Sequence, residues 1–215
     1  MTSRATTSGT AAATRRLAIF DYGAGNIHSL MKAISADDRD ISIETDIRLA
    51  AKADLLVLPG VGAFGAAAGA MRNQQSYLRS ALADGLPCLG ICLGMQLLFD
   101  ASEESPGLGV GFIPGNVTRL RTSKAPHMGW NDIEWRESRN GHKGANLRTA
   151  YFANAYVCQP EDESTIVAWT THQDARFASM VRNVNTVGVQ FHPEKSSFAG
   201  RAFVNAVIED LIRCK

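Results

Sequence analysis

The chain has 215 residues, 45% of them hydrophobic and 20% charged, so it is long enough to bury a core and is expected to form one globular domain. A net charge of +1 provides no broad basic field for nucleic acid or an anionic membrane, and no apolar stretch reaches the roughly 18 residues of a membrane-spanning helix. The four cysteines lack metal-site spacing and are typical of reduced thiols in a cytoplasmic protein.

Residues 1–16 differ from the rest, because they are rich in Ser, Thr and Ala, contain three arginines and contain no acid. We expect a disordered N-terminal extension here, and a short transit peptide is the alternative. Residues 17–215 show no internal repeat and no linker, and are expected to form a single domain.

The first half of this domain alternates between strands and helices. Buried strands are predicted at 17–21, 41–44, 54–60 and 86–91, and helices at 27–34, 65–84 and 93–101. The run 54–60 is apolar on both faces, as in a central parallel strand. The alternation predicts a parallel sheet that is covered by helices on both sides.

The second half is rich in strands. Strand-like runs separated by turn residues lie at 117–120, 132–135, 150–157, 164–169, 177–183 and 186–191. A last amphipathic helix carries Val204, Val207, Ile208 and Leu211 on one stripe. We therefore predict an α/β domain with an antiparallel addition.

Cys92 stands between a predicted strand and a predicted helix, with Gly90 and Gly94 two residues to either side. On a sharp turn, bulky residues at these two positions would collide with neighbouring chain, which is the logic of a nucleophile elbow. The thiol would lie at a helix N-terminus, where the dipole favours the thiolate, and the Leu93 amide would face an oxyanion. The alternative is a buried structural cysteine with glycines for packing.

His192 is the candidate base for this thiol. The buried run 187–191 delivers His192 to its carboxyl end, and Glu194 follows two residues later, so that the two side chains point the same way in extended chain. Glu194 can then fix the tautomer of His192. Because parallel sheets bind ligands at the carboxyl ends of their strands, we expect Cys92 and His192 to meet there. A surface turn with an ordinary ion pair is the alternative.

The motifs "GICLGMQLL" and "GVQFHPEKS" resemble those of the class I (triad-type) glutamine amidotransferase family, and the resemblance covers roughly residues 17–215. Within this family, "DYGAGNIHSL", "LPGVGAF" and "PHMGWN" are similar to the glutaminase subunits of imidazole glycerol phosphate synthase, from histidine biosynthesis. The resemblance implies a flavodoxin-like, mostly parallel sheet flanked by helices, with antiparallel strands added in the second half. It also implies an enzyme that hydrolyses glutamine and needs no cofactor or metal.

By this resemblance, Cys92, His192 and Glu194 form a catalytic triad that works through a γ-glutamyl thioester. It also implies oxyanion or substrate contacts at Gly60, Val61, Gly62, Leu93, Gln96 and Glu103. For Glu103, a surface acid at the end of a helix is the alternative. We further hypothesise that a peptide near Val61 rotates on activation and supplies the second oxyanion N–H.

A partner is implied as well: a (β/α)₈-barrel cyclase that joins ammonia to a phosphorylated ribulosyl nucleotide and releases imidazole glycerol phosphate and an aminoimidazole carboxamide ribotide. Its docking face is expected to surround the mouth of the Cys92 site and to include Asn26, His127, Met128, Trp130 and Lys195. Trp130 is the expected anchor, since buried aromatic residues dominate interface energetics. A core position for Trp130 and a solvated Lys195 are the alternatives.

The chain departs from the family pattern at Asn154 and Ala155, where a His and a small hydroxyl residue are usual. The backbone there is still expected to line the glutamine pocket, but contacts through these two side chains do not carry over. Three other functions are weighed against the main one: a glutaminase that serves another synthase such as pyridoxal phosphate synthase, a catalytically silent regulatory or binding subunit on the same scaffold, and a γ-glutamyl hydrolase that acts alone.

Overall fold

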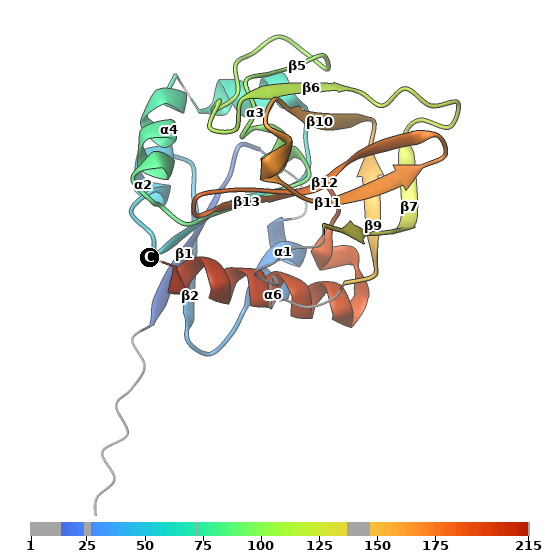
Figure 1. Cartoon of the computed structure of the whole chain (residues 1–215). Helices are drawn as coiled ribbons and strands as arrows, with labels where there is room; N and C mark the ends of the chain where they lie inside the picture. The colour runs from blue at the N-terminus through green and yellow to red at the C-terminus, as the bar shows by residue number, and fades with distance from the viewer. Residues whose placement is uncertain (1–13, 24–26, 72, 137–146, 215) are drawn as a thin grey trace, which may run out of the picture.

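A computed structural model describes residues 14–23, 27–71, 73–136 and 147–214, and its centre is an eight-stranded sheet with helices on both sides (Figure 1). The strand order is β2-β1-β3-β4-β13-β12-β11-β8. Neighbours from β2 to β13 are parallel, and those from β13 to β8 are antiparallel. The predicted flavodoxin-like sheet with an antiparallel addition is confirmed.

The parallel strands are short and fully buried at the centre. They are β2 (Arg39–Glu44), β1 (Arg15–Phe20), β3 (Leu55–Leu58), β4 (Cys88–Ile91) and β13 (Thr186–Val189). The antiparallel strands are β12 (Ala175–Asn183), β11 (Ile166–His172) and β8 (Glu134–Trp135). Every residue of β3, β4 and β13 is buried, as expected of strands that are covered on both faces.

Helices cover both faces of the sheet. On one face lie α1 (Ile27–Ile34) and α6 (Ser197–Arg213); on the other lie α2 (Ile47–Ala50), α3 (Phe64–Ala70), α4 (Gln75–Ala83) and α5 (Leu93–Gln96) (Figure 1). Successive residues of β1 point to opposite faces, so Leu17 and Ile19 belong to the core under α1 and α6, whereas Ala18 and Phe20 belong to the other core. The predicted apolar stripe of the last helix is buried in α6.

Two smaller sheets complete the domain. One contains β5 (Ala101–Ser102), β6 (Gly115–Arg119) and β10 (Tyr156–Pro160), and the other is the antiparallel ribbon of β7 (His127–Asp132) and β9 (Thr149–Asn154). The 3₁₀ turns η1 (Glu163–Thr165) and η2 (Pro193–Lys195) precede β11 and α6. No helix among the described residues is long and apolar enough to cross a membrane.

Several sequence predictions about element boundaries are wrong. The helix predicted at 65–84 is two helices, because Asn73 takes a left-handed backbone with φ of 61° between α3 and α4. The helix predicted from Leu93 to Ala101 stops at Gln96, since Ala101 pairs with β6 instead. The run 150–157 is divided between β9 and β10, and β7 was not predicted as a strand.

β1 begins at Arg15, before the predicted start at Leu17, because Arg15 and Arg16 pair with Arg39 and Asp40 of β2. The predicted extension over 1–16 is therefore too long at its end, and residues 1–13 lie outside the described part of the chain. The side chain of Arg15 is also held, through an ion pair with Glu209 of α6.

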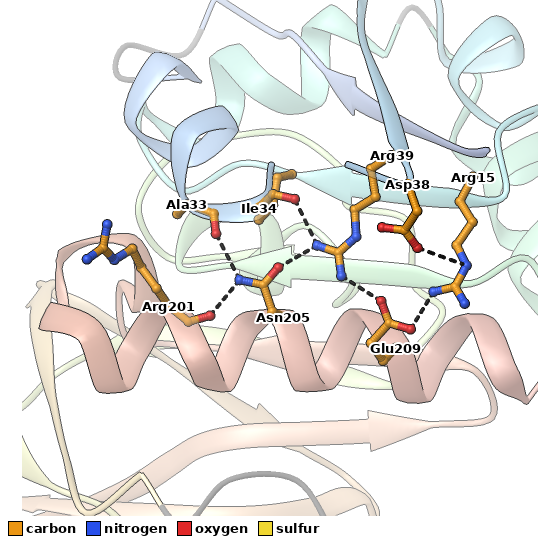
Figure 2. Close-up of polar contacts among 8 residues, drawn as sticks. All are labelled: Arg15, Ala33, Ile34, Asp38, Arg39, Arg201, Asn205 and Glu209. Atoms are coloured by element: carbon orange, nitrogen blue, oxygen red, sulfur yellow. Dashed lines mark hydrogen bonds and ion pairs between the residues drawn. The ribbon is translucent and has the colours of Figure 1, made fainter. Parts of the chain in front are cut away.

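An ion-pair cluster fastens α6 to the edge of the sheet (Figure 2). The Arg39 guanidinium, whose side chain is 3% exposed, donates to Glu209 Oε1 at 2.7 Å and to the Ile34 carbonyl at 2.8 Å. Asn205 of α6 accepts another bond from Arg39 and donates to the Ala33 carbonyl at 3.0 Å. The C-terminal helix is thus bonded to both β2 and α1.

Candidate active site

Three neighbouring strands of the sheet end at one edge and bring distant residues together there. Gly60 follows β3, Cys92 follows β4 and His192 follows β13. They line one pocket of about 210 Å³. Its walls are Gly60, Val61, Gly62, Cys92, Leu93, Gln96, Glu104, Ala153, Asn154, Ala155, Tyr156, His192 and Lys195.

Cys92 lies on a strained turn between β4 and α5. Its backbone has φ of 47° and ψ of −102°, and its N–H donates to the Val189 carbonyl of β13 at 2.7 Å. A Cβ at Gly90 would lie 2.6 Å from the Gly94 oxygen, and a Cβ at Gly94 would overlap the Leu58 carbonyl. The two glycines therefore leave room for the chain to pass at this turn, as the elbow pattern predicted.

His192 and Glu194 form a buried hydrogen-bonded pair beside Cys92. The distance from His192 Nδ1 to Glu194 Oε1 is 2.8 Å, and the two side chains are 2% and 6% exposed. Burial opposes the charge on the imidazolium, but hydrogen bonds to Cys92 and Glu194 outweigh it and raise the pKa of His192 to about 9. At neutral pH the imidazole is therefore protonated, with its Nδ1–H held by the Glu194 carboxylate.

The backbone of His192 is held on both sides by neighbouring chain. Its N–H donates to the Tyr151 carbonyl of β9 at 2.8 Å, and its carbonyl accepts the Ser196 hydroxyl at 2.6 Å. The same hydroxyl accepts the Tyr151 N–H at 2.9 Å. Ser196 thus joins the backbone of His192 to β9.

Leu93 and Gln96 come from the single turn of α5. Leu93 is the first helical residue after Cys92, so its N–H has no acceptor within the helix. This N–H can therefore donate to an oxyanion that forms next to the Cys92 sulfur. Gln96 is 5% exposed, and its Nε2 donates to the Tyr156 carbonyl at 3.3 Å and to Gln190 Oε1 at 3.4 Å. Both bonds use the nitrogen, which leaves Oε1 as an acceptor for a ligand.

The loop after β3 lines the pocket next to His192 and Leu93. A Cβ on Gly60 would be 3.1 Å from His192 Cε1, and Gly62 has φ of 130°, a conformation open to glycine. Tyr22 donates its hydroxyl to the Pro59 carbonyl just before this loop. Burial, and secondarily the charge of Cys92, raises the pKa of Tyr22, which keeps this donor protonated.

The assignment of Glu103 to the pocket is wrong, because the neighbouring Glu104 occupies it. Glu104 lines the cavity and accepts the Phe64 N–H at 2.7 Å. Glu103 points the other way, where it accepts the Arg119 N–H at 2.7 Å and pairs with Arg121 at 3.8 Å. Consecutive side chains in extended chain point to opposite sides. After β5, Glu104 therefore points into the pocket and Glu103 points to the surface.

The residues expected at a partner face divide between surface and core. Met128 and Trp130 of β7 are 60% and 55% exposed, and Lys195 is exposed with its Nζ 5.9 Å from the Tyr151 ring centre. A core position for Trp130 is thereby ruled out. Asn26 lies outside the described residues.

The prediction that His127 lies on the docking face is wrong, because its side chain is buried on the inner face of the β7–β9 ribbon and the residue is 3% exposed. Its ring stacks on Phe152 at 4.8 Å and on His172 at 4.1 Å. Burial, and secondarily the neighbouring His172, lowers the pKa of His127 to about 4. Side chains alternate along β7, so His127 faces inward while Met128 and Trp130 face outward.

Sequence reasoning missed Gln190, Glu104 and Ser196. Gln190 is fully buried, and its Nε2 donates to Cys92 Sγ at 3.5 Å. One signal was readable: a glutamine in the otherwise apolar run "VGVQF" needs a buried partner. Among the residues that the structure describes, no group of three or more His, Cys, Asp or Glu is arranged to hold a metal ion.

The comparisons with known proteins identify the family of the chain. Residues 18–207 match the family Glutamine amidotransferase class-I. The chain is 41% identical over 187 residues to the imidazole glycerol phosphate synthase subunit HisH of Pyrococcus furiosus, covering 86% of this chain and 94% of that one. It is 40% identical over 191 residues to a HisH subunit of Thermus thermophilus, covering 86% of this chain and 93% of that one.

A solved structure supports the fold. PurLQS from Thermotoga maritima superposes with a TM-score of 0.69 at 18% identity, covering 92% of this chain and 99% of that chain. The resemblance noted in the sequence motifs is confirmed over nearly the whole domain. The chain belongs to the class I glutamine amidotransferase family, and within it to the group of imidazole glycerol phosphate synthase HisH subunits.

Proposed function

We propose that this chain is the glutaminase subunit of imidazole glycerol phosphate synthase, and that Cys92, His192 and Glu194 carry its reaction. The observation that supports these roles is the buried pair of His192 Nδ1 and Glu194 Oε1 at 2.8 Å beside a cysteine on a positive-φ turn. A buried structural cysteine has no need of a charged, oriented imidazole next to its sulfur.

In this mechanism the Cys92 thiolate attacks the side-chain carbonyl carbon of glutamine. The oxyanion accepts the Leu93 N–H, and the His192 imidazolium gives its proton to the departing nitrogen, which leaves as ammonia. The γ-glutamyl thioester remains on Cys92. His192 then takes a proton from water and the hydroxide attacks the thioester. The Cys92 thiolate is expelled, and glutamate leaves after its new carboxyl group gives a proton to solvent.

The glutamine would be held by Gln96, Glu104 and the backbone of 153–155. Gln96 Oε1 and the Glu104 carboxylate are acceptors suited to the α-ammonium group of the substrate. Asn154 is 4% exposed and donates to the Tyr156 carbonyl at 3.1 Å, and this bond holds its side chain in the pocket wall. The unusual Asn154 and Ala155 thus keep a polar wall through Asn154 and the backbone.

A glutamine-mimicking electrophile followed by peptide mass mapping tests the triad. We expect one label, on Cys92, although Cys214 is the exposed thiol. Cys92→Ala should lose both the label and glutamine hydrolysis, while Cys214→Ala serves as the matched control and retains them. Labelling confined to other cysteines would reject the assigned nucleophile.

We further propose that the partner is a (β/α)₈-barrel cyclase that receives the ammonia directly. Ammonia released into bulk water would become ammonium, so the mouth of the pocket needs a cover. Ala153 lines the pocket, and Met128 lies opposite it across the ribbon, next to the exposed Trp130. The outer face of β7 and β9 together with Lys195 is therefore the proposed docking face, with Lys195 meeting an acid on the partner.

The loop Gly60–Gly62 is the proposed point of activation. A rotated Val61 peptide would supply the second oxyanion N–H once the synthase site is loaded. Glutamine hydrolysis should rise when both the cyclase and its nucleotide are added. Equal rates with and without them would remove the switch, and full activity of the chain alone would favour the stand-alone γ-glutamyl hydrolase.

A coupled assay separates the remaining synthases. Conversion of the ribulosyl nucleotide in the presence of glutamine and the cyclase should depend on this chain, whereas pyridoxal phosphate formation should not. The four cysteines are free thiols, which suits a reducing compartment such as the cytoplasm and supports that location for the complex.

A further inference from the structure

Gln190 is a fully buried polar residue that the mechanism above leaves without a role. It follows β13 directly, within the run "VGVQF", and is 0% exposed. Its N–H donates to the Ser179 carbonyl of β12 at 2.9 Å, so the backbone is held in the sheet. A buried amide side chain costs free energy unless its donors and acceptor are used.

The side chain of Gln190 joins the nucleophile to the substrate pocket. Its Nε2 donates to Cys92 Sγ at 3.5 Å, and its Oε1 accepts Gln96 Nε2 at 3.4 Å. Gln96 also donates to the Tyr156 carbonyl at 3.3 Å. Because Gln96 can only donate through its nitrogen, the amide of Gln190 is oriented with its own nitrogen toward the sulfur.

Gln190 and His192 approach the sulfur from the same strand. Residues two apart in extended chain point to the same side, and both side chains bond to Cys92. The sulfur therefore has two donors: His192, which can transfer its proton, and the Gln190 amide, which cannot. Because the Gln190 N–H keeps its proton, it stabilises the thiolate relative to the thiol throughout the reaction cycle.

We propose that Gln190 is a positioning residue that holds the Cys92 sulfur as a thiolate and aims it into the pocket, with its own amide oriented by Gln96. This inference rests on the proposed function, since it deepens the role of the same site. A purely structural role, in which Gln190 only fills buried space, predicts no effect on the acidity of the thiol.

Other groups that face the sulfur stay constant in the test. His192 and Glu194 follow β13, Tyr22 follows β1 and Cys158 lies in β10. Burial raises the pKa of Tyr22 and of Cys158, and the charge of Cys92 adds to both shifts; burial lowers the pKa of His192, but hydrogen bonds to Cys92 and Glu194 raise it overall. None of them is changed by a substitution at Gln190, so a shift in the thiol titration reports the lost amide.

The test is the rate of Cys92 alkylation by iodoacetamide as a function of pH, followed by mass spectrometry on the full chain without glutamine. Gln190→Met keeps the length of the side chain and removes the donor. We expect the apparent thiol pKa to rise by about one unit, which lowers alkylation roughly tenfold below that pKa. Gln190→Glu should raise it further, because a carboxylate only accepts and repels the thiolate.

Thr186→Val is the matched control, since Thr186 is a fully buried polar residue at the far end of β13 that the mechanism does not use. It should leave the titration unchanged. Gln96→Met is a second variant that frees the amide of Gln190 without touching the sulfur, and it should raise the thiol pKa by less than Gln190→Met does.

A folded Gln190→Met chain with the wild-type titration would overturn the proposal, and so would an equal shift in Thr186→Val. If Gln190→Met fails to fold, an unchanged titration in Gln96→Met would overturn it as well. These outcomes are independent of the proposed function, because alkylation needs neither glutamine nor the partner. Failure of the glutamine-mimicking label alone would instead reject the glutaminase role.

Discussion

Glu103 and Glu104 are adjacent residues with different environments, and they form a natural pair for testing substrate binding. Glu104 lines the pocket, whereas Glu103 pairs with Arg121 at the surface. We expect Glu104→Gln to raise KM for glutamine about tenfold or more, because a hydrogen bond from the substrate ammonium loses its charged acceptor. Glu103→Gln should leave KM within about twofold.

Steady-state kinetics on the complex with the cyclase measure both variants. Because Gln at 104 keeps an oxygen for the Phe64 N–H, α3 should remain capped and the fold unchanged. An increase of KM in both variants, or in Glu103→Gln alone, would contradict the placement of the two side chains.

The raised pKa of His192 makes stability depend on pH. The folded value is about 9 and the ordinary value is 6.5, so the folded state binds the proton more tightly. The contribution, about 3 kcal/mol, is complete below pH 6.5 and is lost as pH rises through 9. Denaturant unfolding of the wild type and of His192→Gln should therefore differ most at pH 6 and least above pH 9. A constant difference across this range would contradict the raised pKa.

The turn between β4 and α5 is an element whose shape depends on two glycines. A Cβ at Gly94 would overlap the Leu58 carbonyl, whereas a Cβ at Gly69 in α3 meets nothing within 4 Å. We expect Gly94→Ala to destabilise the chain by about 1–3 kcal/mol and to displace Cys92, with loss of hydrolysis. Gly69→Ala should be neutral or stabilising by up to about 1 kcal/mol. Thermal unfolding compares them, and equal Tm values would disprove the close approach.

The two faces of the β7–β9 ribbon differ in burial, and we expect them to have different roles. Trp130 points outward and His127 inward, where it stacks on Phe152. Trp130→Ala should weaken binding of the cyclase by at least about 2 kcal/mol, roughly 30-fold in Kd, with Tm unchanged. His127→Ala should instead lower Tm, because it leaves a cavity in the core. Calorimetric titration with the cyclase and thermal unfolding distinguish the two variants. Unchanged cyclase binding by Trp130→Ala would contradict the proposed docking face.

At the scale of the whole molecule, α6 is fastened to the edge of the sheet through Arg39 (Figure 2). Arg39→Met should lower the free energy of unfolding by about 2 kcal/mol, since Glu209 and Asn205 lose a buried donor. Lys52→Met, at an exposed position, is the control and should change it by less than about 0.5 kcal/mol. Urea unfolding measures both, and similar values would mean that apolar packing alone holds α6.

The same helix links the fold to the site. α6 starts directly after η2, which carries Glu194, and Ser196 between them bonds to the backbone of His192. A change that loosens α6 is therefore expected to reach the triad through η2. Two cores, one on either side of the sheet, bury the central strands on both faces.

Local pattern was sufficient for much of this protein. The alternation of buried strands and amphipathic helices predicted the doubly covered sheet, and glycines at 90 and 94 predicted the turn at Cys92, because both depend on neighbours within a few residues. The spacing of His192 and Glu194 predicted their pair for the same reason. Motifs shared with the family supplied the identity of the reaction.

Only the tertiary structure decided which side chains share the pocket. Gln190 reaches Cys92 across 98 residues of chain, and Glu104 replaces Glu103 because the pairing of β5 with β6 sets which residue faces inward. Likewise, His127 is buried because β7 pairs with β9, a strand more than twenty residues later. Such choices depend on the register between strands that are distant in the sequence, and a shift of one residue would turn every side chain of a strand to the other face.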